Sequence, residues 1–166
     1  MTTIIDSLLD AGITDIVVWN NAQRDNKKCY GRYLGIQEAK HPYVFHQDDD
    51  LVSPVAGLLA AYDPVKDAER IVAANRPDED WRLTGIGSVF HRSLASVLDR
   101  YLDKHEEDDL FHRTCDVTFA YLNRYRSVPL AYEDLPWASD PQSSMYLERD
   151  HMEARETMLR RVKELA

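Results

Sequence analysis

The chain has 166 residues, of which 44% are hydrophobic and 30% are charged, and its formal net charge at pH 7 is −9. This length is sufficient for one domain with a hydrophobic core, and the excess of acidic residues argues against a nucleic-acid-binding protein. No apolar run reaches the length of a membrane span, and no basic region followed by an apolar core opens the chain, so we expect a cytoplasmic protein. Cys29 and Cys115 lack the short spacing of a zinc site, which favours two reduced thiols.

The first predicted elements are a helix and a strand. Residues 3–11 place apolar side chains on one helical face, which predicts a helix, and the residue type of Gly12 predicts its C-cap. Residues 13–19 are β-branched and apolar, which predicts a buried strand that ends at Asn20 and Asn21. The polar residues that come next, 22–31, predict a loop, and a helical turn is expected over residues 36–40.

The centre of the chain carries the most informative motif. Residues 43–45 predict a short buried strand, and the carboxylates of Asp48, Asp49 and Asp50 follow it directly. Ser53 and Pro54 then predict the N-cap and first turn of a helix that extends to residue 62. Because open α/β sheets bind ligands at the carboxyl ends of their strands, these acids could hold a divalent cation against a substrate phosphate. Taken alone, they could equally be a solvated acidic turn before the helix.

The second half of the chain continues the alternation of strands and helices. Gly85 and Gly87 mark a place where the backbone turns sharply or approaches another group closely. The other predicted elements are a strand at 71–73, a helix at 94–102, an acidic loop at 106–109, a buried helix at 117–122, a strand at 128–132 and a charged amphipathic helix at 145–165. This alternation predicts a single α/β domain over residues 1–166.

The start of the chain is unusual for such a fold. The first helix begins within a few residues of Met1, whereas an α/β unit usually starts with a strand. We therefore expect either a fold that begins with a helix or a first strand that is missing from this sequence through N-terminal truncation. A strand at residues 13–19 without a neighbour on one edge would invite self-association.

The motifs together resemble glycosyltransferases of the GT-A type. In those enzymes one strand ends in an asparagine-rich loop, as residues 15–21 do here, and a later strand ends in an Asp-x-Asp motif, as residues 44–50 do. The resemblance is strongest to the branch that contains the exostosin-like and family 2-like transferases, some of them from bacteriophages. Residues 84–90 are similar to its glycine-containing acceptor-side segment, and residues 115–119 to its Cys-Glu-Asp segment. The resemblance implies a nucleotide-diphospho-sugar transferase with an α/β/α sandwich that lacks its first strand.

The resemblance also implies a role for particular residues. Asp50 would bind Mn²⁺ or Mg²⁺ directly, Asp48 would contact the ribose or a metal-bound water, and Asp49 would support the loop. The cation would stabilise the diphosphate leaving group of a nucleotide-sugar donor. The remaining assignments are Asn20 and Asn21 at the donor, Asp116 as the base for an acceptor hydroxyl, His151 as a further metal ligand and Arg155 at a phosphate.

Several of these assignments have alternatives. Cys115 stands where the family often has a second acid, so Asp108 or Asp109 could replace Asp116 as the base. His151 and Arg155 could instead be exposed residues of a charged helix, and His46 is expected to be a packed residue rather than a ligand. Asp48-x-Asp50 also fits a haloacid-dehalogenase-like phosphohydrolase, in which the first aspartate is the nucleophile. A third possibility is a degenerate transferase domain that binds a nucleotide or partner without catalysis.

Overall fold

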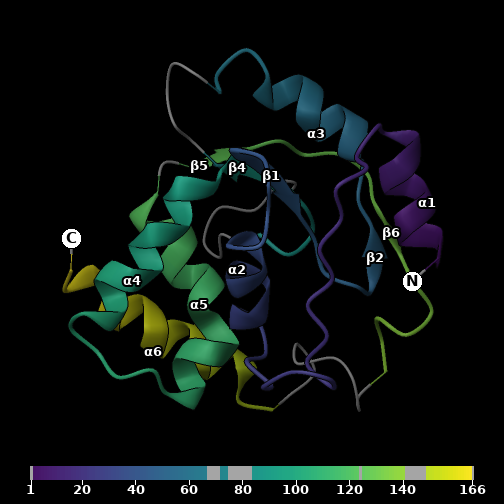
Figure 1. Ribbon diagram of the computed structural model, residues 1–166. Coiled ribbons are helices and arrows are strands. Elements are labelled where there is room, and N and C mark those ends of the chain that lie inside the picture. Colours follow the sequence, from purple (N-terminus) through teal and green to yellow (C-terminus); the bar gives the residue numbers. More distant parts are fainter. Residues whose placement is uncertain (1, 67–71, 75–83, 124, 141–148, 166) are drawn as a thin grey trace.

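A computed structural model describes residues 2–66, 72–74, 84–123, 125–140 and 149–165, and it contains a mixed four-stranded sheet (Figure 1). The strands lie in the order β1 (Tyr43–His46), β4 (Ser88–His91), β3 (Val72–Ala74) and β5 (Tyr125–Ser127). Strand β4 is antiparallel to β1 and β3, whereas β3 and β5 are parallel. Strands β1, β3 and β5 therefore point the same way, and their carboxyl ends meet at one edge of the sheet. A separate antiparallel pair joins β2 (Leu51–Val52) to β6 (Glu133–Asp134).

Helices cover both faces of the four-stranded sheet. On one face, Ala73 and Val89 pack against Leu58 and Tyr62 of α3 (Val55–Tyr62). The opposite face packs against a larger group of helices, namely α2 (Tyr30–Ile36), α4 (Val97–Leu102), α5 (Asp109–Leu122) and α6 (His151–Lys163). Alternate residues of β1, β3 and β4 supply the two faces, as the pleat of a strand requires. The α/β class predicted from the sequence is confirmed, and the structure shows that its four-stranded sheet is mixed.

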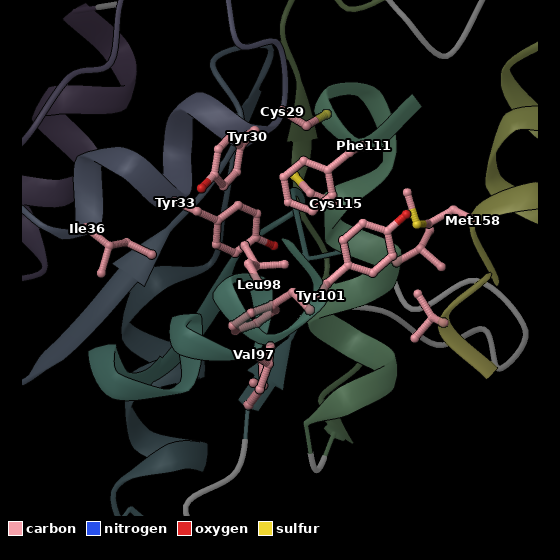
Figure 2. Packing of buried hydrophobic residues seen from close by; sticks show 14 of the residues in the cluster. Cys29, Tyr30, Tyr33, Ile36, Val97, Leu98, Tyr101, Phe111, Cys115 and Met158 are labelled. Atoms are coloured by element: carbon pink, nitrogen blue, oxygen red, sulfur yellow. The ribbon is translucent and has the colours of Figure 1, made fainter. Parts of the chain in front are cut away.

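The larger core is rich in aromatic side chains and contains both cysteines (Figure 2). Phe111 stacks on Tyr101 with ring centroids 5.1 Å apart and meets Tyr30 edge to face at 4.8 Å. Cys29 and Cys115 are buried among these rings as free thiols, and burial raises the pKa of Cys29 to about 12. The prediction of two reduced cysteines is confirmed, and the Cys29 thiol is un-ionised at neutral pH.

The N-terminal helix, α1 (Thr2–Asp10), has the predicted bounds to within one residue. Its end is a Schellman turn, in which the amide of Ile13 donates to the Leu8 carbonyl and the amide of Gly12 to the Leu9 carbonyl, both at 2.9 Å. Gly12 has φ +82°, the left-handed conformation that this turn requires. The C-cap role predicted for Gly12 is confirmed.

The strand predicted for residues 13–19 is wrong. No strand is assigned there, and Val17 and Val18 are 37% and 46% exposed. In the described part of the chain, the backbone groups of residues 14–18 make no hydrogen bond to another backbone group. A β-branched sequence favours the extended conformation, but a strand forms only where a neighbouring strand supplies the hydrogen bonds.

Three other predictions differ in detail. Ser53 is not an N-cap: Pro54 takes that position without a side-chain bond, while the Ser53 side chain packs against Gly87. Helix α2 begins at Tyr30, inside the predicted loop, because its aromatic residues bury against α5. The strand predicted at 128–132 lies instead at Tyr125–Ser127, where β3 offers a parallel partner.

The predicted helix at 94–102 is confirmed as a short 3₁₀ turn, Arg92–Ser96, followed by α4. The C-terminal helix α6 starts at His151, and its predicted first residues, 145–148, fall outside the described residues, as does Ile71 of the predicted strand at 71–73. Within the described ranges, no helix has the length and apolar character needed to cross a membrane.

Candidate functional site

The aspartate triplet lies at the sheet edge where the carboxyl ends of β1, β3 and β5 meet. Asp48 is two residues beyond the end of β1, and its amide donates to the carbonyl of Gly85 at 2.8 Å. Residues 84–87 lead into β4, the neighbour of β1, so the turn before β4 lies beside the triplet. This edge is where open α/β sheets place their ligands.

An ion pair joins the first aspartate of the triplet to helix α2. The guanidinium of Arg32 contacts the carboxylate of Asp48, and their side chains are 16% and 37% exposed. Gly85 lies directly against this pair, since a Cβ at that position would overlap Asp48 Oδ2 and approach Arg32 Nη1 to 2.9 Å. The close backbone approach predicted at Gly85 is confirmed, and the group it approaches is the Arg32–Asp48 pair.

Two buried side chains hold the turn before β4 in place. The hydroxyls of Tyr33 and Thr84 share a hydrogen bond of 3.0 Å, and His46 Nε2 donates to the Thr84 carbonyl at 3.1 Å. Burial lowers the pKa of His46 to about 3, so this imidazole is neutral. Its ring also meets Phe90 edge to face, with centroids 5.2 Å apart. The prediction that His46 is a packed residue is confirmed.

The second and third aspartates are held by the segment around β6. The Leu135 amide donates to the Asp50 carbonyl at 2.8 Å, and Trp137 Nε1 donates to the Asp49 carbonyl at 2.9 Å. These two bonds use the backbone carbonyls of the two residues and not their carboxylates. Burial raises the pKa of the Asp50 carboxyl to about 6, and the neighbouring charges of Asp48, Asp49 and Asp134 act in the same direction.

A second buried ion pair lies close to the first. Arg155 Nη1 of α6 donates to both oxygens of Asp116 on α5, at 2.9 and 3.2 Å, and the two side chains are 3% and 6% exposed. Burial raises the pKa of Asp48, and the Asp116 charge adds to that shift while Arg32 and Arg155 oppose it. The fold thus brings Asp48 and Asp116 into one cluster with two arginines, although they are far apart in the sequence.

His151 and Arg155 occupy the same face of α6, and both are buried. The alternative that they are exposed residues of a charged helix is therefore wrong, because this face of α6 packs against α5. Asp150, just before His151, pairs with Arg113 of α5 at 2.8 Å and anchors the start of the helix.

The acids proposed as substitutes for Asp116 have structural partners. Asp108 caps α5 by accepting from the Phe111 amide at 2.8 Å, and it also pairs with Arg161 at 2.8 Å. Partial burial raises the pKa of the Asp108 carboxyl, but the bonds to Arg161 and the Phe111 amide outweigh this effect, so its pKa is lowered. Asp109 is exposed and pairs with Lys28 at 2.7 Å.

Asn20 and Asn21 organise the loop that follows residues 13–19. Asn20 Oδ1 accepts from the Ala22 amide at 2.9 Å, and Asn21 Oδ1 accepts from Trp19 Nε1 and from the Lys27 amide, both at 3.1 Å. These bonds give both asparagines a local structural role. Trp81 and Tyr146, two aromatic residues that could stack on a ligand, lie outside the described residues.

The triplet has the oxygen ligands that a hard cation prefers. Among the described residues, no three His, Cys, Asp or Glu side chains are grouped closely enough to hold a metal ion by themselves, and His151 forms no such group with the triplet. Mg²⁺ bound together with substrate phosphates usually needs only one or two protein carboxylates. The Asp50 carboxylate, with Asp48 beside it, fits a cation of that kind.

Comparison with models of protein families, with curated proteins and with solved structures finds no match. Sequence reasoning identified the acids and the glycine turn but missed Arg32. In the sequence, Arg32 is only a cationic residue next to a segment predicted as a polar loop. The pairing of Arg32 with Asp48 depends on the packing of α2 against α5.

Proposed function

We propose that this protein is a metal-dependent glycosyltransferase. A nucleotide-sugar donor would bind with Mn²⁺ or Mg²⁺ at Asp48 and Asp50, and an acceptor hydroxyl would approach Asp116. The observation that carries the proposal is the convergence of Asp48 and Asp116 in one charged cluster at the carboxyl edge of the sheet. Donor activation needs a carboxylate that binds the cation, and acceptor activation needs a carboxylate that takes up a proton. The two carboxylates must lie near one another.

The surrounding side chains suit this chemistry. A bound divalent cation would neutralise charge on the diphosphate leaving group. The Asp50 carboxylate would face the cation, while Arg32 holds Asp48 and Trp137 holds the backbone of Asp49. Arg155 fixes the orientation of the Asp116 carboxylate, which still has lone pairs able to accept the proton of an attacking hydroxyl.

The first test is calorimetric titration of the protein with uridine, guanosine and adenosine diphosphates in the presence of Mn²⁺. We expect one of them to bind to the parent and Asp50→Ala to abolish that binding, because the principal metal carboxylate is lost. Asp103→Ala removes an exposed carboxylate at the end of α4 and serves as the control. Equal binding by the parent and Asp50→Ala would contradict the proposal.

Asp116→Asn separates binding from chemistry. This change should leave binding of the diphosphate intact and lower the rate of sugar transfer about a hundredfold, the usual cost of losing a general base. Transfer would be followed as release of nucleoside diphosphate from the matching nucleotide sugar. Binding without any transfer in the parent would instead indicate a degenerate, non-catalytic domain.

A further inference from the structure

The Arg32–Asp48 pair is confined on several sides. Helix α2 cannot easily move its arginine away, because Tyr33, the next residue, is buried against Phe119 with ring centroids 5.0 Å apart. On the other side, the pair lies against the backbone of Gly85, where an added Cβ would displace the Asp48 carboxylate. The Asp48 carboxylate is therefore held beside a fixed positive charge.

Asp50 has a different electrostatic environment. The charges that act most strongly on its carboxyl are those of three acids, Asp48, Asp49 and Asp134. A divalent cation would be attracted by this group but repelled by the guanidinium next to Asp48. A cation that arrives with a diphosphate brings negative charge that offsets the repulsion. The charge of Arg32 should thus lower the affinity of the site for the metal ion alone and favour binding of the metal ion together with a nucleotide.

We infer that Arg32 is a built-in counter-ion which keeps Asp48 from binding a free divalent cation, so that the cation enters the site together with a diphosphate. The inference rests on the proposed function and adds an order of binding to it. Arg32 is a positioning residue in this scheme, since it acts through the Asp48 carboxylate. Because arginine keeps its charge at all physiological pH values, the barrier to free metal is permanent.

The test is a titration with Mn²⁺ alone, in which the electron paramagnetic resonance signal of unbound Mn²⁺ reports binding. Arg32→Gln should bind Mn²⁺ about tenfold more tightly than the parent, the effect expected for removing a unit charge about 6 Å from a divalent ion in a water-like environment. Arg32→Lys keeps the charge and should stay close to the parent. Arg24→Gln, which removes an exposed arginine paired with Glu38, is the matched control.

Unchanged or weaker Mn²⁺ binding by folded Arg32→Gln would overturn the inference, even if the parent binds Mn²⁺ with a nucleoside diphosphate as proposed above. If Arg32→Gln does not fold, the unmodified protein provides the decisive measurement. Its Mn²⁺ affinity should rise at least about tenfold when uridine diphosphate, or the diphosphate found to bind above, saturates the site. Equal affinity with and without that nucleotide would overturn the inference, whereas absence of any nucleotide binding would refute the proposed function itself.

Discussion

Asp50 is held in an environment that disfavours its charged form. Burial and three neighbouring acids raise the pKa of its carboxyl to about 6, against an ordinary value near 4. Its backbone carbonyl accepts a hydrogen bond of 2.8 Å from the Leu135 amide, which fixes the main chain of this residue beside β6. At neutral pH the protein therefore keeps an ionised carboxylate at a cost in stability. A bound cation would remove that cost.

This cost predicts the pH dependence of stability. Between pH 4 and 6 the folded protein binds more protons at Asp50 than the unfolded chain does, so this residue's contribution to stability falls as the pH rises through that interval. Asp50→Asn should raise the free energy of unfolding by about 1 kcal/mol at pH 7, a value reduced for solvent screening, and by almost nothing at pH 4. Urea unfolding at both pH values measures this, with Asp103→Asn as the control. A gain of equal size at pH 4 would show that the charge of Asp50 is not its source.

Two of the ion pairs that join helices α5 and α6 differ greatly in the exposure of their carboxylates. Asp116 and Arg155 are almost completely buried, whereas Arg113 pairs with Asp150, whose side chain is 62% exposed. The sequence predicted both helices from their apolar residues, including 117–122 of α5. It did not predict that α5 begins at Asp109, because the cap formed by Asp108 looked like part of an acidic loop. Nor could it show the pairing of Asp116 with Arg155, which depends on how the two helices pack.

The two pairs should differ in their effect on stability. Asp116→Asn leaves a buried guanidinium without its carboxylate and should lower the free energy of unfolding by about 3 kcal/mol. Asp150→Asn breaks a pair whose carboxylate is exposed to solvent, although its Arg113 side chain is only 10% exposed, and should cost about 1 kcal/mol. Chemical denaturation of the two variants provides the comparison. Adding Arg155→Met to Asp116→Asn should recover part of the loss, and equal losses in the two single variants would show that burial of the pair has little importance.

The whole molecule assembles its candidate site from distant parts of the chain. Arg32, Asp48, Gly85, Asp116 and Arg155 come from α2, the end of β1, the turn before β4, α5 and α6. The sequence could identify acids after a strand and a glycine turn, because strand ends and turns have local signatures. It could not provide the strand order β1-β4-β3-β5, since strand pairing between distant segments has no local signature. The incorrect strand at residues 13–19 has the same origin: its composition is that of a strand, but no other segment among the described residues supplies backbone hydrogen bonds to residues 14–18.

Residues 13–19 also have a consequence for the state of the protein in solution. Exposed Val17 and Val18 lie in a segment, residues 14–18, whose backbone groups bond to no other backbone group of the described residues, and Leu9 of α1 is 47% exposed. Such segments pair readily with another chain, so we expect self-association that increases with protein concentration.

Val18→Lys should weaken this self-association about tenfold, because an ammonium group would have to be desolvated in the contact. Sedimentation velocity over a range of concentrations measures the effect. Met152→Lys on α6 is the matched control, since Met152 and Val18 are 45% and 46% exposed. Equal association of Val18→Lys and the parent, or an equal loss in Met152→Lys, would place the contact elsewhere on the surface.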